Sequence, residues 1–269
     1  MRIEKLFSYP IKSTRGQRLE KASILRTGIC GDRTIAVINK EFKIVTGRES
    51  PELIKVSSVF EGGILTMETP AEVVSLEVPM GYEFVKIKLF RNEVNGMPFG
   101  KKANDWISKY LGGDYRLVFL GKSFRPILSK RGGKSGEQVG YADSAPVHLI
   151  SRKSLNELNS RLKHEVTERN FRPNFIIDGE VAYEEDHWKS VRINGLDFRV
   201  QERTQRCIFT TIDPKTGKRN ENLQPLTTIA KMRLKSGLRP TFGINLIPMG
   251  EGEIAVNDGI EINPFNTSN

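Results

Sequence analysis

Alternation of apolar and polar side chains is the commonest pattern along this chain, and it predicts a protein built mainly of β-strands. The segment from Phe84 to Phe90 alternates apolar and basic side chains, as a half-buried strand does. Short apolar runs at 34–38, 175–177 and 243–247 predict further strands. Strands and helices do not alternate regularly, which disfavours an all-parallel sheet. We therefore expect an α+β, β-rich fold, with antiparallel strands in a barrel or sandwich and helices packed outside.

Two turn signals in the second half of the chain predict β-hairpins. An Asn-Gly pair at 194–195 lies in the middle of the alternating segment 191–200, and Asn-Gly is the strongest short-range signal for a hairpin. An Asn-Asp-Gly triplet at 257–259 lies within the segment 253–262. We expect each segment to fold back on itself as two paired strands.

Few helices are predicted, and all of them are short. Asn104 is expected to cap a helix that ends at Gly112, because Asn favours the N-cap and Gly the position after the last turn. Ser151 is expected to cap a second helix, and Pro225 to begin a third. The stretch 129–138, rich in Gly, Lys and Ser, is the best candidate for a linker or long loop.

Length and composition indicate a soluble globular protein. The chain has 269 residues, of which 38% are hydrophobic and 28% charged, and this suffices for one large domain or two small ones. No apolar run approaches the roughly 20 residues needed to span a bilayer, and the N-terminus does not resemble a signal peptide. We expect a cytoplasmic protein with no membrane partner.

The net charge of +10, from 42 basic and 32 acidic residues, suggests an anionic partner. Nucleic-acid binders cluster their basic residues, often with aromatic side chains between them, whereas here basic and acidic residues are interleaved along the chain. We therefore expect no nucleic-acid partner, although a basic RNA-binding module stays a weaker alternative. The densest positive run, the basic loop (residues 122–134), suits an acidic protein or an anionic ligand.

Cysteine and histidine usage excludes several kinds of site. The chain has two cysteines, Cys30 and Cys207, and three histidines, so it has neither a disulfide framework nor the usual zinc spacings. Two thiols are too few for an iron–sulfur cluster, which usually takes four. His148 lies in an apolar run and is expected to be a satisfied interior or edge residue, while His187 is expected at the surface.

Three common catalytic motifs receive little support. A phosphate-binding Walker A loop needs Gly five positions before its Gly-Lys-Ser, but these positions hold Arg116 and Leu128. No Gly-x-Ser-x-Gly elbow of a serine hydrolase is present. A cysteine protease with Cys207 as nucleophile and a histidine as base is compatible with the spacing, but it leaves the Thr-Thr-x-Asp-Pro turn after Cys207 unexplained.

Cys207 is the most informative residue of the chain. It follows Arg203 and Arg206 on an apolar strand, and a hydroxyl-rich turn comes directly after it. A neighbouring positive charge favours a thiolate over a thiol, and a thiolate is both a strong nucleophile and a soft metal ligand. The segment therefore suits a cysteine used in chemistry, and a buried structural cysteine is the alternative.

Four further segments combine basic side chains, hydroxyl groups and strand ends. They are 9–13 (Tyr-Pro-Ile-Lys-Ser), 31–33 (Gly-Asp-Arg), 141–146 (Tyr-Ala-Asp-Ser-Ala-Pro) and 170–174 (Asn-Phe-Arg-Pro-Asn). Lys and Arg at strand ends, together with Ser hydroxyls and backbone N–H groups, can bind an anion such as a phosphate. Each segment alone is more simply explained as a surface charge at the end of a strand.

Taken together and in this order, these segments and the one around Cys207 resemble the MOSC family. That family comprises the C-terminal domain of molybdenum cofactor sulfurase and its relatives, and the similarity is greatest to the amidoxime reducing components and their bacterial counterparts. It extends from about residue 3 to about residue 262. The specific motifs are Asn-Phe-Arg-Pro-Asn at 170–174 and Arg-Cys-x-x-Thr-Thr-x-Asp-Pro at 206–214.

The resemblance implies a MOSC-type β-barrel at 121–269, preceded by a smaller β-rich MOSC-associated domain at 1–120, with a few short helices. It places a molybdenum cofactor (molybdopterin) between the two domains and makes Cys207 the molybdenum ligand. The positions that match contacts to the pterin or its phosphate are Lys12, Ser13, Arg33, Asp143, Ser144, Arg172, Gln205 and Arg206. Gln205 stands where many relatives have Ser, so a backbone contact is preserved there and a hydroxyl contact is not. Cys30 matches no ligand position and is expected to be structural.

The function that the resemblance implies is reduction of small N-hydroxylated compounds such as hydroxylamines and amidoximes. Because the sequence has no flavin, haem or iron–sulfur ligand set, electrons are expected from a separate ferredoxin- or cytochrome-like protein with its reductase. The basic loop is expected to dock this donor. The mitochondrial leader and the ferredoxin domain of some relatives are not expected here. A carrier of molybdenum cofactor or of sulfur, without reductase turnover, stays the alternative.

Overall fold

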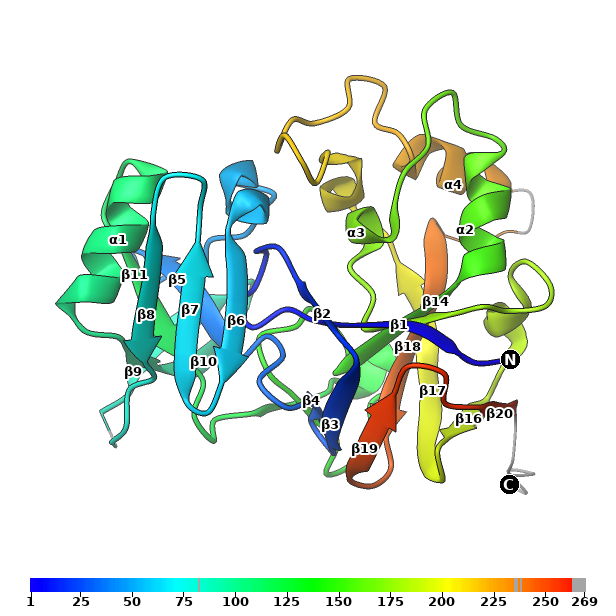
Figure 1. Ribbon diagram of the computed structural model, residues 1–269, viewed down its shortest axis with the longest axis horizontal. Coiled ribbons are helices and arrows are strands. Elements are labelled where there is room, and N and C mark those ends of the chain that lie inside the picture. The colour runs from blue at the N-terminus through cyan, green and yellow to red at the C-terminus, as the bar shows by residue number, and fades with distance from the viewer. Residues whose placement is uncertain (82, 235–236, 238, 263–269) are drawn as a thin grey trace.

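Strands dominate the fold and are arranged in two lobes (Figure 1). The computed structural model describes residues 1–81, 83–234, 237 and 239–262. The small lobe comprises residues 35–119, and the large lobe comprises the C-terminal half together with the first 30 residues. The prediction of a β-rich α+β protein with a few short helices is confirmed. Within the described residues, no helix is long and apolar enough to cross a membrane.

The small lobe consists of two antiparallel sheets and one helix. One sheet has the strand order β5-β11-β10-β9 and the other β6-β7-β8. Their bounds are β5 (Ile35–Asn39), β6 (Ser57–Glu61), β7 (Ile64–Glu68), β8 (Val73–Glu77), β9 (Val85–Leu89), β10 (Asn92–Pro98) and β11 (Tyr115–Phe119), with α1 (Lys101–Leu111) and a 3-10 helix at Pro51–Lys55. Val37, Leu65, Trp106 and Leu117 meet in the core between the sheets and α1, which holds these elements together.

The helix α1 begins earlier than its expected cap. Gly100 occupies the N-cap position, and Asn104 lies inside the first turn. The Asn104 side chain donates to the carbonyl oxygen of Phe99 (3.3 Å) and accepts from the backbone N–H of Leu117 (3.1 Å). It therefore joins α1 to β11 instead of capping the helix, so the predicted start was wrong. The predicted end is confirmed, because Gly112 adopts the left-handed conformation with φ 71°.

The large lobe is built on an eight-stranded sheet with the order β2-β1-β15-β14-β18-β17-β16-β20. Its strands are β1 (Ile3–Ser8), β2 (Gln17–Leu19), β14 (Val147–Ser151), β15 (Phe175–Ile177), β16 (Ser190–Ile193), β17 (Leu196–Gln205), β18 (Thr241–Pro248) and β20 (Ile260–Ile262). Within the described residues the sheet is open, with β2 and β20 at its edges. β14 and β15 pair in parallel, and the other neighbours are antiparallel.

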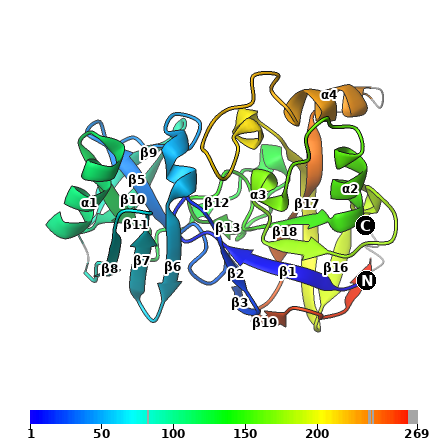
Figure 2. The same cartoon turned by 45° about the horizontal axis from the view of Figure 1, so that its top comes forward.

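Helices and a second small sheet flank this eight-stranded sheet. The helices α2 (Arg152–Asn159), α3 (Glu168–Phe171) and α4 (Leu226–Leu234) gather on one side of the lobe (Figure 2). The sheet β19-β3-β4, formed by Gly252–Ala255, Lys21–Leu25 and Gly28–Ile29, lies on the opposite side (Figure 1). The predicted starts of two helices are confirmed: Ser151 caps α2 by accepting from the N–H of Lys153, and α4 begins directly after Pro225. The stretch 129–138 forms the loop between β12 (Arg125–Pro126) and β13 (Gln138–Val139).

One predicted hairpin is confirmed and the other was wrong. β16 and β17 pair across the Asn194-Gly195 turn, and both turn residues have positive φ, as a two-residue turn of type I′ requires. β19 and β20 do not pair with each other, because β19 pairs with β3 and β20 with β16, and the start of the N-terminal strand bonds the turn between them. The N–H of Ile3 donates to the carbonyl of Asp258 (3.0 Å), and the N–H of Asn257 donates to the carbonyl of Ile3 (2.8 Å).

The N-terminal 30 residues belong in space to the large lobe. β1 pairs with β15, and β3 pairs with β19. Residues 9–16, between β1 and β2, touch the small lobe through the bridges Ile11–Ile35 and Arg15–Ser57, and the chain itself runs through the small lobe from β5 to β11. Division of the chain into folding units at residue 120 stays a prediction, and residues 263–269 of the second unit lie outside the described part.

Candidate functional site

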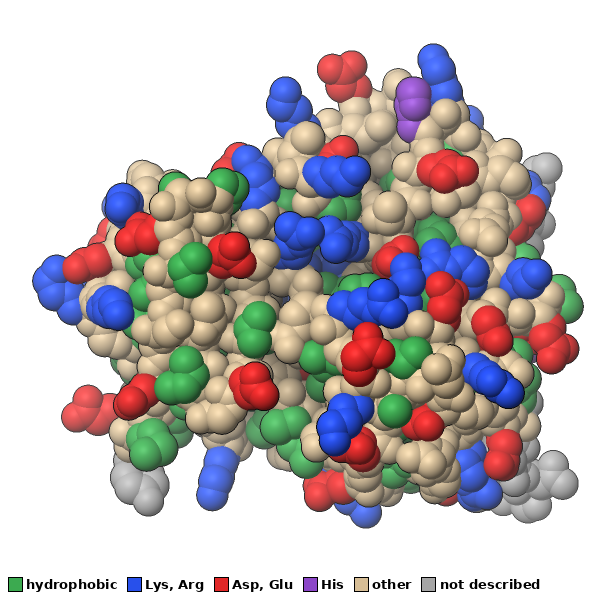
Figure 3. All heavy atoms as spheres, in the orientation of Figure 1, with side chains coloured by type: hydrophobic (Ala, Val, Ile, Leu, Met, Phe, Trp, Pro, Cys, Tyr) green, Lys and Arg blue, Asp and Glu red, His purple; other side chains and the backbone are tan. Residues whose placement is uncertain are grey.

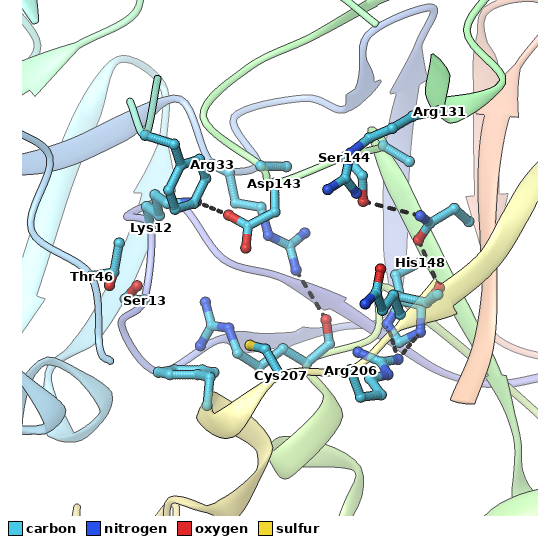
Figure 4. A pocket seen from close by; sticks show the side chains of 18 of the residues that line it. Lys12, Ser13, Arg33, Thr46, Arg131, Asp143, Ser144, His148, Arg206 and Cys207 are labelled. Atoms are coloured by element: carbon cyan, nitrogen blue, oxygen red, sulfur yellow. Dashed lines mark hydrogen bonds and ion pairs between the residues drawn. The ribbon is translucent and has the colours of Figure 1, made fainter. Parts of the chain in front are cut away.

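A cavity of about 600 Å³ lies at the junction of the two lobes. Its walls come from both: Arg48 and Phe90 belong to the small lobe, and Asp143 and Cys207 to the large lobe. Cavities of this size typically hold a cofactor or a small molecule. Figure 4 shows Lys12, Ser13 and Thr46 on one side of the cavity. Ser144 and His148 lie on the other side, and Cys207 lies between the two groups.

All nine residues that the sequence nominated for the site line this one cavity. They are Lys12, Ser13, Arg33, Asp143, Ser144, Arg172, Gln205, Arg206 and Cys207. They come from five segments of the chain, the first and last of which are almost 200 residues apart. The structure therefore brings the predicted set together around one cavity.

Three of these nine residues have a left-handed backbone, which L-residues rarely adopt. Ser13 has φ 71°, Arg33 φ 49° and Arg172 φ 56°. Each such residue costs on the order of 1–3 kcal/mol, and residues of this kind cluster at ligand-binding and catalytic sites. A fourth lining residue, Phe90, has φ 57°. The fold therefore tolerates strain at several points around the same cavity.

Lys12, Asp143 and Arg48 form a chain of charges across the cavity. Lys12 is buried and donates through Nζ to the carbonyl of Tyr141 (2.7 Å) and to Asp143. Arg48 donates through Nη2 to Asp143 Oδ2 at 2.6 Å. Burial alone would raise the pKa of Asp143, but the two cations outweigh it and lower that pKa below its usual range. Burial lowers the pKa of Lys12, and Asp143 partly offsets this.

Cys207 lies at the mouth of the turn that follows β17, and a small-lobe residue contacts its sulfur. Arg48 Nε donates to Cys207 Sγ at 3.3 Å. The hydroxyl-rich turn after Cys207 is stabilised from within, because Thr210 Oγ1 donates to the carbonyl of Cys207 (2.9 Å) and Thr211 Oγ1 to that of Ile208 (2.7 Å). These two hydroxyls therefore stabilise the backbone of the turn that carries Cys207. The partly exposed Sγ is available to a soft metal or an electrophile.

The Asn-Phe-Arg-Pro-Asn segment holds the cysteine turn from the other side. Asn170 Nδ2 donates to the carbonyl oxygens of Thr210 and Ile212, each at 3.2 Å. Asn174 accepts from Arg33 Nη1 at 3.0 Å and from the N–H of His148 at 3.1 Å. The two asparagines of this motif thus fix the backbone around the cavity, which explains why both occur in it.

Arg172 retains a side-chain donor that has no partner in the described part of the chain. Its guanidinium lies over the ring of Tyr9 (4.2 Å), whose ring is also contacted by Arg33 (4.5 Å). Nη1 donates to the carbonyl of Thr14, whereas the buried Nη2 has no partner among the described residues. Burial and the neighbouring Arg33 lower the pKa of Arg172 to about 10. A buried cation with an unused N–H is costly unless a ligand binds there, so Arg172 suits an anion.

Arg206 is committed mainly to the protein. It donates to the carbonyls of Phe242 (2.6 and 2.9 Å) and Phe171 (3.2 Å), and it contacts the His148 ring. Burial lowers the pKa of Arg206 to about 9. Burial and Arg206 also lower the pKa of His148 well below its usual value, so this imidazole is neutral at pH 7. His148 is buried, as expected, but it also forms part of the cavity wall.

Uncharged hydrogen-bonding groups line the end of the cavity beside Ser144. Asn245 donates through Nδ2 to Ser144 Oγ at 3.1 Å, and Thr204 Oγ1 donates to Asn245 Oδ1 at 2.7 Å. Gln205 is exposed next to them. The cavity therefore offers neutral donors and acceptors at this end, where Arg131 also lies beside Ser144 in Figure 4.

Positive charge dominates the lining as a whole. Among the described lining residues, one is acidic, Asp143, and nine are Lys or Arg: Lys12, Arg33, Arg48, Arg91, Arg125, Lys130, Arg131, Arg172 and Arg206. Lys and Arg side chains also gather over the junction of the lobes on the face shown in Figure 3. An excess of cations in a cavity walled by protein attracts an anionic ligand.

Sequence reasoning missed Arg48, Phe90 and Asn245 as cavity residues. Arg48 follows Gly47, at which an added Cβ would lie 2.1 Å from the Phe209 ring, so only glycine allows this close approach. Gly47 is the one sequence feature that could have indicated this close approach, but the ring that it packs against, Phe209, is about 160 residues away in the sequence. Cys30, expected to be structural, is exposed, as is His187.

Comparison with known proteins adds three findings. The family model for the MOSC N-terminal beta barrel domain matches residues 1–114, and that for the MOSC domain matches residues 136–261. The mitochondrial amidoxime-reducing component 1 of Homo sapiens is 32% identical over 275 residues, which cover 96% of this chain and 82% of the relative. Component 2 of Bos taurus is 32% identical over 276 residues, with the same coverage. The crystal structure of the YUAD protein of Bacillus subtilis is 11% identical, covering 97% of this chain and 94% of that one, with a TM-score of 0.44.

Proposed function

This chain belongs to the MOSC domain family, and on that premise we propose that it is a molybdenum-cofactor-dependent reductase of N-hydroxylated compounds. Its relatives at 32% identity are named for amidoxime reduction, and the similarity extends over nearly the whole chain. The observation that carries the proposal is the convergence of the five predicted segments on one cationic cavity with a cysteine sulfur in its wall.

The residues present fit a molybdenum cofactor. Cys207 supplies a soft thiolate ligand, which suits a heavy metal. The unused Nη2 of Arg172 and the cationic surplus near Lys12 suit a phosphate group. Ser144 and Asn245 supply neutral hydrogen-bonding groups for a heterocycle. The residues that we propose to hold the cofactor are Lys12, Ser13, Arg33, Asp143, Ser144, Arg172, Gln205 and Arg206.

The bound cofactor supplies two-electron chemistry: the N–O bond of the substrate breaks, two electrons and two protons are consumed, and the oxygen leaves as water. This chain's own residues bind and orient. Arg48 holds the sulfur of Cys207 in a fixed position through its 3.3 Å hydrogen bond. Asp143 accepts from both Lys12 and Arg48, so it links these two cations in the cavity wall. The single carboxylate therefore orders two of the cations that face the ligand.

We further propose that electrons arrive from a separate acidic redox protein that docks on the basic loop. Lys130 and Arg131 of this loop are exposed and also line the cavity. A donor bound there lies next to the site, and complementary charge accelerates its encounter. The loop therefore has both the charge and the position that a docking surface needs.

The test is to purify the chain from a host that makes molybdenum cofactor and to measure bound molybdenum and turnover of an amidoxime. We expect near-stoichiometric metal and reduction by the wild type, with both lost in Cys207→Ser. A wild type without molybdenum in such a host would overturn the proposal. Bound metal or sulfane sulfur without turnover of any N-hydroxylated compound would instead indicate the carrier.

A further inference from the structure

The turn between β9 and β10 carries an aromatic residue in a conformation that disfavours it. Leu89 pairs with Asn92, so Phe90 and Arg91 are the two turn residues. Two-residue hairpin turns need positive φ at the first turn position, where Gly, Asn or Asp is usual. Phe90 occupies this position with φ 57°. The fold accepts this backbone cost, which indicates that the side chain has a use there.

The Phe90 ring lies beside the proposed reaction centre. It lines the cavity, and half of its surface is exposed. Lys12 Nζ lies 5.5 Å and Arg48 Cζ 5.3 Å from the ring centroid. Arg48 is also the residue that contacts Cys207 Sγ. One side chain therefore separates the ring from the sulfur, while part of the ring stays open to the cavity.

Exposed apolar surface is scarce around this cavity. Among the described lining residues, the large apolar side chains that are exposed are Phe90 at 50% and Leu128 at 37%, from opposite lobes. Phe171 also lines the cavity but is buried, and Phe209 lines it but is less exposed, with its ring packed against Gly47 and Arg172. The cations suit the cofactor and the donor protein, so these two apolar side chains are the ones suited to the carbon skeleton of a substrate.

From this geometry we propose that Phe90 is a specificity-determining residue, whose ring stacks on aromatic N-hydroxylated substrates and favours them over aliphatic ones. The inference rests on the proposed reductase function and adds to it the class of substrate. Stacking of two aromatic rings contributes more than burial of the same area, so an aryl substrate gains a contact that an alkyl substrate lacks.

The test compares an aryl amidoxime with an alkyl amidoxime for the wild type, Phe90→Ala and Phe90→Tyr. A reduced viologen dye serves as electron donor, and rates are normalised to bound molybdenum. We expect Phe90→Ala to lower kcat/KM for the aryl substrate about tenfold, chiefly through KM. For the alkyl substrate we expect a change of less than about twofold, and Phe90→Tyr retains the wild-type ratio.

Phe42→Ala is the matched control. Phe42 also has positive φ (56°), is 36% exposed and lies under an arginine, Arg116, but it does not line the cavity. It is expected to leave both substrates unchanged. If Phe90→Ala lowered kcat/KM equally for both substrates, the ring would only support Lys12 and Arg48. If it changed kcat/KM for neither substrate, the ring would not contact the substrate. Either result overturns the inference. A molybdenum-loaded wild type that reduces neither substrate would overturn the proposed function itself.

Discussion

Arg48 Nε lies 3.3 Å from Cys207 Sγ, although 159 residues separate the two in the sequence and they belong to different lobes. The contact makes the small lobe part of the sulfur's immediate surroundings. The same guanidinium reaches Asp143 at 2.6 Å, and Asp143 in turn contacts Lys12. Burial alone would lower the pKa of Arg48, but Asp143 and the Cys207 sulfur outweigh it and raise that pKa, so Arg48 is charged throughout the physiological range.

Replacement of Arg48 is expected to impair the site without unfolding the protein. Arg48→Gln removes the charged donors to Cys207 and Asp143, and hydrogen bonds to charged groups contribute about 1.5–3 kcal/mol each. We therefore expect bound molybdenum to fall and kcat/KM per molybdenum to fall about tenfold or more. Arg116→Gln, which removes an arginine of the same lobe away from the cavity, is the control. Equal metal content and turnover in both variants would contradict a role for Arg48.

Two substitutions of Ser13 are expected to separate stability from ligand binding. Ser13 has φ 71°, which glycine adopts without penalty. Ser13→Gly is expected to raise the free energy of unfolding by about 1 kcal/mol, and Ser13→Ala is not, because alanine keeps the strain. Both lose the hydroxyl and are expected to retain less molybdenum. Urea unfolding and metal analysis measure the two effects. If glycine improved both, the hydroxyl would have no part in binding.

The sequence predicted features that depend on neighbouring residues. Asn194-Gly195 supports a turn because both residues accept positive φ, and Ser151 caps α2 with its own hydroxyl. The Asn-Asp-Gly turn at 257–259 gave the same kind of signal, yet no hairpin forms there. β19 pairs instead with β3 and β20 with β16, and nothing near residue 257 records these distant partners. Asn104 failed for a similar reason, because its side chain bonds β11 and not its own helix.

At the site, too, residues in recognisable motifs were predicted and residues that act through distant contacts were not. The motif residues were identified because five segments together match a family, and all of them line the cavity. Arg48 and Phe90 were missed because each acts through a contact across the lobes. The strained φ of Phe90 and the close packing of Gly47 on Phe209 are visible only in three dimensions. Local sequence does not record which residues from distant segments meet.

Neutralising the basic loop is expected to weaken coupling to an acidic electron donor. Replacing Lys130, Arg131 and Lys134 with Gln should raise KM for the donor about tenfold at low ionic strength and flatten its salt dependence. The control replaces the three exposed lysines of α1 (Lys101, Lys102 and Lys109), which removes the same charge from the far side of the small lobe. Equal effects of both triple variants would indicate net charge and not docking on the loop.

Glu185 is expected to make the free energy of unfolding depend on pH, and Glu185→Gln is expected to remove this dependence. Its side chain is fully buried, accepts from Ser154 Oγ at 2.9 Å through Oε2, and has no partner for Oε1 among the described residues. Burial raises the pKa of Glu185 to about 7. Between about pH 4.5 and pH 7 the folded protein therefore holds a proton that the unfolded chain has released, so the free energy of unfolding falls as pH rises through this window.

The size of this effect follows from the two pKa values: about 3 kcal/mol is lost between pH 4 and pH 8, after which the penalty is constant. Glu185→Gln cannot ionise, so its free energy of unfolding should exceed that of the wild type at pH 8 and approach it at pH 4.5. Urea unfolding at four or five pH values gives the free energy of unfolding of both proteins. Taking the difference between the two values removes the contribution of every group that titrates alike in both. Glu221→Gln, at an exposed position, controls for the loss of one charge. A difference that did not vary with pH would show that Glu185 ionises normally in the folded protein.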